Sequence, residues 1–150
     1  MKCQLTKLCK VVSQTTEKMQ SLPLLFLRLV LAYGFWGPAT MKWQDINAIG
    51  DWFASMNIPF PLLNAYMAAG TEMAGVFLLL FGFGTRLISI PLIITMIVAI
   101  FTVHFPNGFE AGNNGYEIPL YYMLMLFTLT VYGSGNISVD YLFKKQSASS

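Results

Sequence analysis

The chain has 150 residues, of which 55% are hydrophobic and only 11% are charged, and its formal net charge at pH 7 is +2. This composition is too apolar for an ordinary soluble domain. The sequence shows no basic groove for nucleic acid and no GxGxxG, P-loop, CxxC, HExxH or GxSxG motif. It therefore indicates neither a nucleic-acid-binding protein nor an enzyme of the classes that those motifs mark.

The apolar residues fall into four blocks, at residues 22–40, 62–83, 87–103 and 118–132. Each block is about 15 to 22 residues long, close to the roughly 20 residues that a helix needs to cross a bilayer. The sequence therefore predicts an all-α membrane protein, with a bundle of four transmembrane helices over residues 22–143. A signal peptide before a soluble domain fits less well, because three more apolar blocks follow the first and no cleavage site precedes a polar domain.

Lysine and arginine residues near the span ends predict the orientation, because cytoplasmic segments hold an excess of them. An even number of spans places both termini on one side of the membrane. That side carries nearly all the flanking cationic residues, whereas the other side carries only Lys42. We therefore expect a multi-pass protein of the cell inner membrane with cytoplasmic N and C termini, whose loops 41–61 and 104–117 face outward.

Outside the spans, we expect residues 1–21 to form an amphipathic cytoplasmic arm and residues 144–150 to form a disordered tail. On a helix, the arm places its lysines opposite an apolar face, which is typical of a helix lying in the lipid headgroups. Docking of a soluble partner is the alternative, and membrane anchoring is favoured over it. Cys3 and Cys9 lie in this arm, where thiols stay reduced, and their spacing without a nearby histidine is not a metal signature.

The first outer loop holds a second amphipathic stretch, at residues 46–56, which is followed by Pro59 and Pro61. Its apolar and polar residues separate onto opposite sides of a helix. We expect a short interfacial helix, with a stiff connection to the second span, that covers the outer mouth of the bundle as a fixed lid. Trp43 and Trp52 would anchor this helix, because tryptophan is enriched at membrane interfaces.

Two ionisable residues fall inside the apolar blocks, Arg28 in the first and Glu72 in the second. Each costs about 2.5 to 3.5 kcal/mol in hydrocarbon and needs a compensating interaction. Counting the helical rise from the span ends separates the two by roughly 9 Å along the membrane normal, and helical side chains lean toward their own N-terminus, so the two point apart. This geometry disfavours a direct ion pair unless the helices tilt. It favours extension of Arg28 toward the cytoplasmic headgroups.

Glu72 has better candidate partners near the outer surface. Lys42 ends the first span, His104 ends the third and Glu117 begins the fourth. Four aromatic residues lie at similar depths: Trp36, Tyr66, Tyr116 and Tyr121. If these residues face inward, Glu72 forms the floor of a polar pocket, either as a neutral acid that hydrogen-bonds a neighbour or as a proton-exchanging group. A protonated glutamic acid that only ties helices together is the alternative.

Glu72 and His104 are therefore the candidate catalytic residues, as groups that exchange protons, although an interfacial hydrogen-bonding role is the alternative for His104. The candidate ligand-binding residues are Arg28, Trp36, Lys42, Glu117 and Tyr121. Methionine is frequent in the spans, and thioethers together with imidazole suit copper(I). No M-x-x-M or H-x-x-M cluster occurs, so packing explains the methionines better and no metal site is predicted.

The order of several short motifs resembles the DoxX family of four-helix membrane proteins. The motifs are Arg28, the stretch 35–42, Ala68-Ala-Gly-Thr-Glu72 with Gly75, the turn Gly82-Phe-Gly-Thr-Arg86, and His104 at the end of the third span. Residues 115–127 and Ile137-Ser-Val-Asp-Tyr141 are similar to the HvfX-type subgroup. The resemblance covers about residues 22–143 and implies a redox-linked membrane accessory. The family takes its name from a membrane subunit linked to thiosulfate oxidation and quinone reduction, and the subgroup is associated with maturation of copper-binding modified peptides.

Two functions from different classes follow. In the first, the protein is a redox-linked membrane subunit whose outer pocket binds a small redox substrate, such as a quinone headgroup or a sulfur species. Glu72 and His104 would exchange protons there, and Lys42 would attract an anion. In the second, the protein is a non-catalytic membrane partner that anchors a soluble enzyme or helps to export a modified peptide. Both functions, and a choice between quinone and copper as cofactor, stay open at the level of sequence.

Overall fold

The computed structural model describes residues 19–147, whose regular structure is entirely helical. The helices are α2 (Ser21–Gln44), α3 (Ile46–Ser55), α4 (Pro61–Phe81), α5 (Thr85–Ala99), α6 (Glu117–Tyr132) and α7 (Val139–Ser147). A π-helical turn, η1 (Ile100–His104), continues α5, and the 3-10 turns η2 (Phe105–Asn107) and η3 (Ala111–Asn113) follow. Most of the expected N-terminal arm, up to residue 18, lies outside the described residues.

Helices form at all four of the apolar blocks. Three of them are long and apolar enough to cross a membrane: α2, α4 and the continuous helical stretch Thr85–Asn107. The fourth, α6, is apolar but has only 16 residues. The prediction of an all-helical protein with several membrane spans is therefore confirmed. The count of four spans and the cytoplasmic position of the termini stay predictions.

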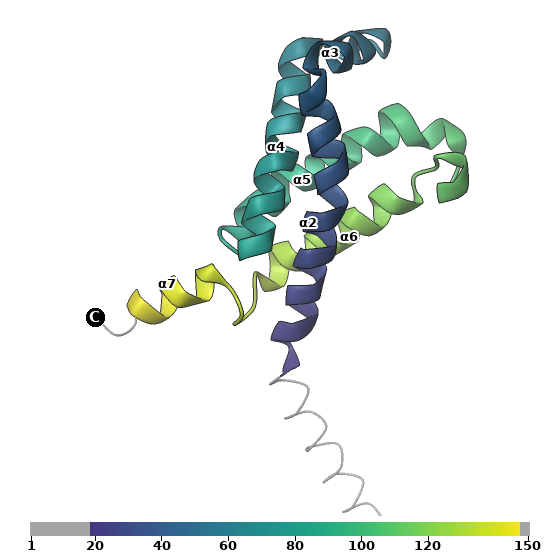
Figure 1. Cartoon of the computed structure of the whole chain (residues 1–150). Helices are drawn as coiled ribbons and strands as arrows, with labels where there is room; N and C mark the ends of the chain where they lie inside the picture. Colours follow the sequence, from purple (N-terminus) through teal and green to yellow (C-terminus); the bar gives the residue numbers. More distant parts are fainter. Residues whose placement is uncertain (1–18, 148–150) are drawn as a thin grey trace, which may run out of the picture.

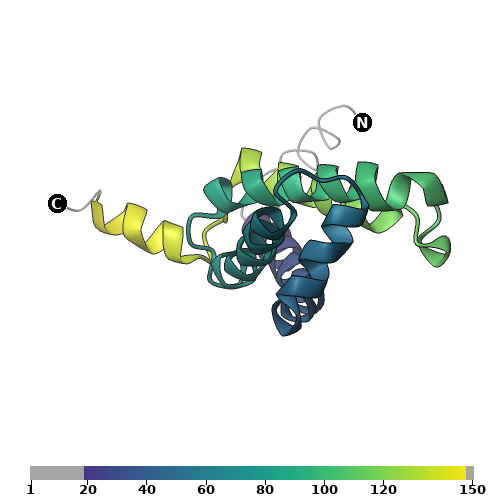
Figure 2. The same cartoon turned by 90° about the horizontal axis from the view of Figure 1, so that it is seen from above.

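The helices are arranged as two pairs that cross (Figure 1). α2 packs on α4, and α5 packs on α6. Seen from above, α5 and α6 form one layer and α2 and α4 form the other (Figure 2). Side chains from all four helices form the hydrophobic core, whose buried members are Leu31, Ala32, Phe35, Val76, Leu79, Leu92, Met96, Leu126 and Leu129. Beyond the crossing, the two layers diverge toward the end of the molecule where α3 lies, which we call the α3 end (Figure 1).

Glycine allows α4 and α5 to approach closely. Gly82 ends α4 and Gly84 precedes α5, and both have a left-handed backbone, with φ of +67° and +59°. Further along α4, a Cβ atom at Gly75 would lie only 2.8 Å from a methyl carbon of Leu92. The absence of a side chain at Gly75 therefore lets α5 contact α4 directly at this level.

Residues 133–140, called the clasp below, connect α6 to α7 across the end of the bundle opposite to α3. Arg28 of α2 donates a hydrogen bond from Nη2 to the carbonyl oxygen of Ile137. The Asp140 carboxylate accepts hydrogen bonds from the backbone N–H groups of Gly84 (2.8 Å) and Thr85 (3.2 Å), and so caps the N-terminus of α5. α7 then leaves the bundle (Figure 1) and continues through Ser147, so residues 144–147 are helical where a disordered tail was expected.

Candidate functional site

A cavity of about 650 Å³ lies between the two layers at the α3 end. This volume is in the usual range for small-molecule sites, about 300–1,000 Å³. Helix α3 contributes Ile49, Trp52 and Phe53 to its wall, so a helix does form in the stretch 46–56 and it lines the cavity. Most of the lining side chains are apolar. The pocket is therefore mainly hydrophobic, with a few polar groups, and the expectation of a polar pocket is wrong in this respect.

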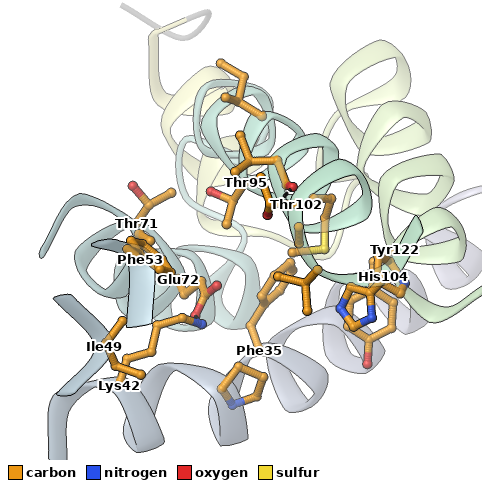
Figure 3. Close-up of a pocket in the computed structure, with 18 of the residues that line it drawn as sticks. Phe35, Lys42, Ile49, Phe53, Thr71, Glu72, Thr95, Thr102, His104 and Tyr122 are labelled. Carbon is orange, nitrogen blue, oxygen red and sulfur yellow. Dashed lines mark hydrogen bonds and ion pairs between the residues drawn. The ribbon is translucent and has the colours of Figure 1, made fainter. Parts of the chain in front are cut away.

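Glu72 and Lys42 form an ion pair in the wall of this cavity (Figure 3). Glu72 is only 3% exposed, and the ammonium group of Lys42 donates a hydrogen bond to it, with Nζ and Oε2 2.6 Å apart. Lys42 lies in the last turn of α2 and Glu72 lies in the middle of α4. A carboxylate buried this deeply needs a charged or hydrogen-bonding partner, and Lys42 supplies both interactions.

His104 lies away from this pair, on the other side of the view in Figure 3. Its Nδ1 atom is 2.8 Å from the carbonyl oxygen of Asn114. Because a carbonyl oxygen can only accept, Nδ1 carries the proton in this contact, and in the neutral form of the ring Nε2 is a hydrogen-bond acceptor. The π-helical turn places three consecutive residues, Thr102, Val103 and His104, in the cavity wall. Such turns are frequent at functional sites.

Hydroxyl and thioether groups also line the cavity. They belong to Thr71, Thr95, Thr102, Tyr122, Met41, Met67 and Met96. The hydroxyl groups of Thr95 and Thr102 each donate to a carbonyl oxygen of their own helix, at 3.0 and 2.8 Å, which leaves their oxygen lone pairs as acceptors. Sequence reasoning considered the methionines of the spans, but it did not single out Thr95, Thr102 or Tyr122. The signal that could have found them is the presence of threonine within apolar blocks.

Five of the residues that were grouped with Glu72 do not line the cavity: Trp36, Tyr66, Tyr116, Glu117 and Tyr121. Glu117 accepts hydrogen bonds from the backbone N–H of Ala111 (3.0 Å) and from the hydroxyl group of Tyr121 (3.1 Å), so these residues organise the start of α6. Trp36 is 49% exposed and contacts Phe77 edge-on. The tyrosine that lines the cavity is the next one along the chain, Tyr122.

Arg28 lies at the opposite end of the bundle from the cavity. Its expected extension toward headgroups is wrong, because the clasp covers it and leaves it only 1% exposed. Its Nε and Nη1 atoms have no hydrogen-bond partner within residues 19–147. Over the same residues no ion pair joins Arg28 to Glu72, which agrees with the geometric argument against that pair.

The polar groups of the cavity do not form an obvious metal site. Within residues 19–147, no group of three or more His, Cys, Asp or Glu side chains could hold a metal ion. The thioethers of Met67 and Met96 and the ring of His104 do line the same cavity. The arrangement thus offers a hydrophobic space with a buried ion pair in one part of its wall and an imidazole ring in another.

Comparison with known proteins agrees with this architecture. The DoxX family profile matches residues 23–105, which include nearly all of α2, the helices α3 to α5 and Glu72. The chain is 37% identical over 130 residues to an uncharacterized protein of Haemophilus influenzae, a match that covers 81% of this chain and 83% of that protein. It is 30% identical over 123 residues to the Bacillus subtilis protein named "Putative oxidoreductase CatD", covering 80% of this chain and 87% of that protein. No solved structure gives a significant match. The chain is therefore a membrane protein that belongs to the DoxX family.

Proposed function

We propose that this protein is a redox-linked membrane subunit whose cavity at the α3 end binds a quinone ring. The observation that carries the proposal is the combination of a mainly apolar cavity with two separate polar regions, the Lys42–Glu72 pair and His104. A flat ring with a polar group at each end matches such a site, because its faces need hydrophobic contacts and its two oxygens need hydrogen-bonding partners.

The residues of the cavity fit the chemistry of this ligand. A quinone takes up electrons together with protons when it is reduced, so its site benefits from groups that exchange protons. Lys42 donates hydrogen bonds, Glu72 can pass a proton to or from a neighbouring oxygen, and His104 presents a ring nitrogen that can accept one. The similarity to a protein named as an oxidoreductase supports a redox role of this kind.

The four-span topology, the cytoplasmic termini and the inner-membrane location belong to this proposal. They rest on the distribution of lysine and arginine around the spans. In this orientation the cavity lies near the outer surface of the membrane. Resemblance to the HvfX-type subgroup would add a link to copper-binding peptides, for which Met67, Met96 and His104 are the candidate ligands within the cavity.

The test is to purify the full chain in mild detergent, extract it with organic solvent and measure bound quinone by absorbance and bound copper by elemental analysis. We expect quinone at near-equimolar amounts, and a large loss of it in Glu72→Gln. Glu110→Gln, which changes an exposed loop carboxylate, is the matched control and should retain quinone.

Each other outcome contradicts a specific part of the proposal. Copper without quinone would favour the copper-peptide function. A retained peptide or protein with neither small ligand would favour the non-catalytic membrane partner. Equal quinone content in Glu72→Gln and Glu110→Gln would show that Glu72 stabilises the helices without taking part in ligand binding.

A further inference from the structure

The α3 end of the cavity is covered, which limits access from the water on that side. Asp45 caps α3 by accepting a hydrogen bond from the backbone N–H of Ala48 at 3.0 Å. Gly50 of α3 packs against Leu62 of α4, where a Cβ atom would lie 3.1 Å from a methyl carbon of Leu62. Trp52 lines the cavity from the same helix. α3 is therefore capped at its start and packed on α4 at its middle, and it covers the cavity as a roof.

The side of the cavity between α2 and α6 is closed by an aromatic contact. Tyr122 of α6 lies so close to Gly34 of α2 that a Cβ atom there would be 2.0 Å from the tyrosine oxygen. The ring of Tyr122 also meets Phe35 edge-to-face, with centroids 5.5 Å apart. Because Gly34, Phe35 and Tyr122 all line the cavity, this contact forms its wall on that side.

The side between α4 and α5 is different. These helices touch where Leu92 packs on Gly75. One face of α4 carries Gly75, Thr71 and Ala68 in this order toward the α3 end, because residues four and seven apart share a helix face. Thr71 and Ala68 line the cavity, so α5 does not cover this face of α4 beyond Gly75.

Large apolar side chains flank this opening and are exposed at the surface of the spans. Met67 of α4 is 60% exposed, and Ile94 and Val98 of α5 are 56% and 45% exposed, yet all three also line the cavity. Side chains that face both a cavity and the outer surface mark a passage between the two. In helices that cross a membrane, the surface at this level is hydrocarbon.

We infer that the ligand enters sideways from the bilayer, through a seam between α4 and α5 formed by Met67, Ala68, Thr71, Ile94 and Val98. This inference rests on the proposed function and adds a property of the ligand: it carries a hydrocarbon chain, which stays in the seam while the ring lies among the polar groups. A water-soluble ligand that crosses the α3 roof has no need of such an opening.

The experiment uses the full chain in lipid vesicles and two probes, long-chain ubiquinone and its ring without the chain, dimethoxy-methyl-benzoquinone. Binding is followed by quenching of tryptophan fluorescence, because Trp52 lines the cavity. Ala68→Phe places a ring in the seam, and Val98→Ala widens it. Leu80→Phe also introduces a ring on α4, at an exposed site outside the cavity and away from the seam, and is the control.

We expect Ala68→Phe to slow association of both probes by about tenfold, since the seam is the open side of the cavity, and to speed dissociation of long-chain ubiquinone alone, since only its chain stays in the seam. Val98→Ala should speed association of both probes, and Leu80→Phe should behave as the wild type. Unchanged long-chain rates in both seam variants would overturn the inference while leaving the proposed function intact. If neither probe binds to the wild type, the proposed function is overturned instead.

Discussion

The strength of the Lys42–Glu72 pair can be measured by a double-mutant cycle. Lys42→Met leaves a carboxylate that is 3% exposed without its cation, and loss of one partner of a buried pair costs about 3–5 kcal/mol. Glu72→Gln costs less, about 1–2 kcal/mol, because the side chain of Lys42 is 13% exposed and its ammonium group can still donate to the amide oxygen. Independent effects would sum to about 4–7 kcal/mol. We expect the double variant to lose only about 2 kcal/mol, because neither charge is then left alone.

The assay is unfolding of the purified protein in mixed micelles, with added sodium dodecyl sulfate and circular dichroism as the readout. The control is a cycle between Arg28→Gln and Glu72→Gln. Arg28 and Lys42 are fourteen residues apart on α2, which is about 21 Å of helix, so the effects at Arg28 and Glu72 should add to within about 0.5 kcal/mol. A coupling free energy below about 0.5 kcal/mol for Lys42 and Glu72 would refute the reasoning, since the two charges would then not depend on each other.

Three other predictions concern the clasp and the topology. Gly84→Ala should lower the free energy of unfolding by about 1–2 kcal/mol, because the backbone there is left-handed while the space around the new methyl group is open. Gly82→Ala should lower it further in the same unfolding assay, because its Cβ atom would lie 1.7 Å from Nη1 of Arg28. Asp140→Ala should cost about 1–2 kcal/mol by removing the cap of α5, and an unchanged stability would show that the clasp does not hold that helix end. Asn47→Cys, in a chain otherwise free of cysteine, should react with an impermeant thiol reagent added to intact cells. Labelling only after lysis would show that the loop 41–61 faces the cytoplasm.

The relation between sequence and structure is clearest at the tyrosines of α6. Counting the helical rise from the span ends placed Tyr121 at the depth of the pocket, whereas Tyr122 lines the cavity in the structure. Adjacent helical residues differ in direction by about 100°, so a small error in the rotation of a helix exchanges one for the other. Apolar periodicity cannot fix that rotation in a membrane helix, because the side facing lipid is as hydrophobic as the side facing the bundle.

The sequence by itself determined the positions of the four apolar helices, the lid helix α3, and the two ionisable residues that needed partners, because length, hydropathy and helical spacing are local properties. It also determined the membership of the DoxX family. Only the tertiary structure decided which partners those residues found. Lys42 reaches Glu72 from 30 residues away, and the clasp covers Arg28 from 109 residues away. Contacts of this kind depend on how the two helix pairs cross and on where the chain returns after α6, and no local pattern in the sequence encodes either.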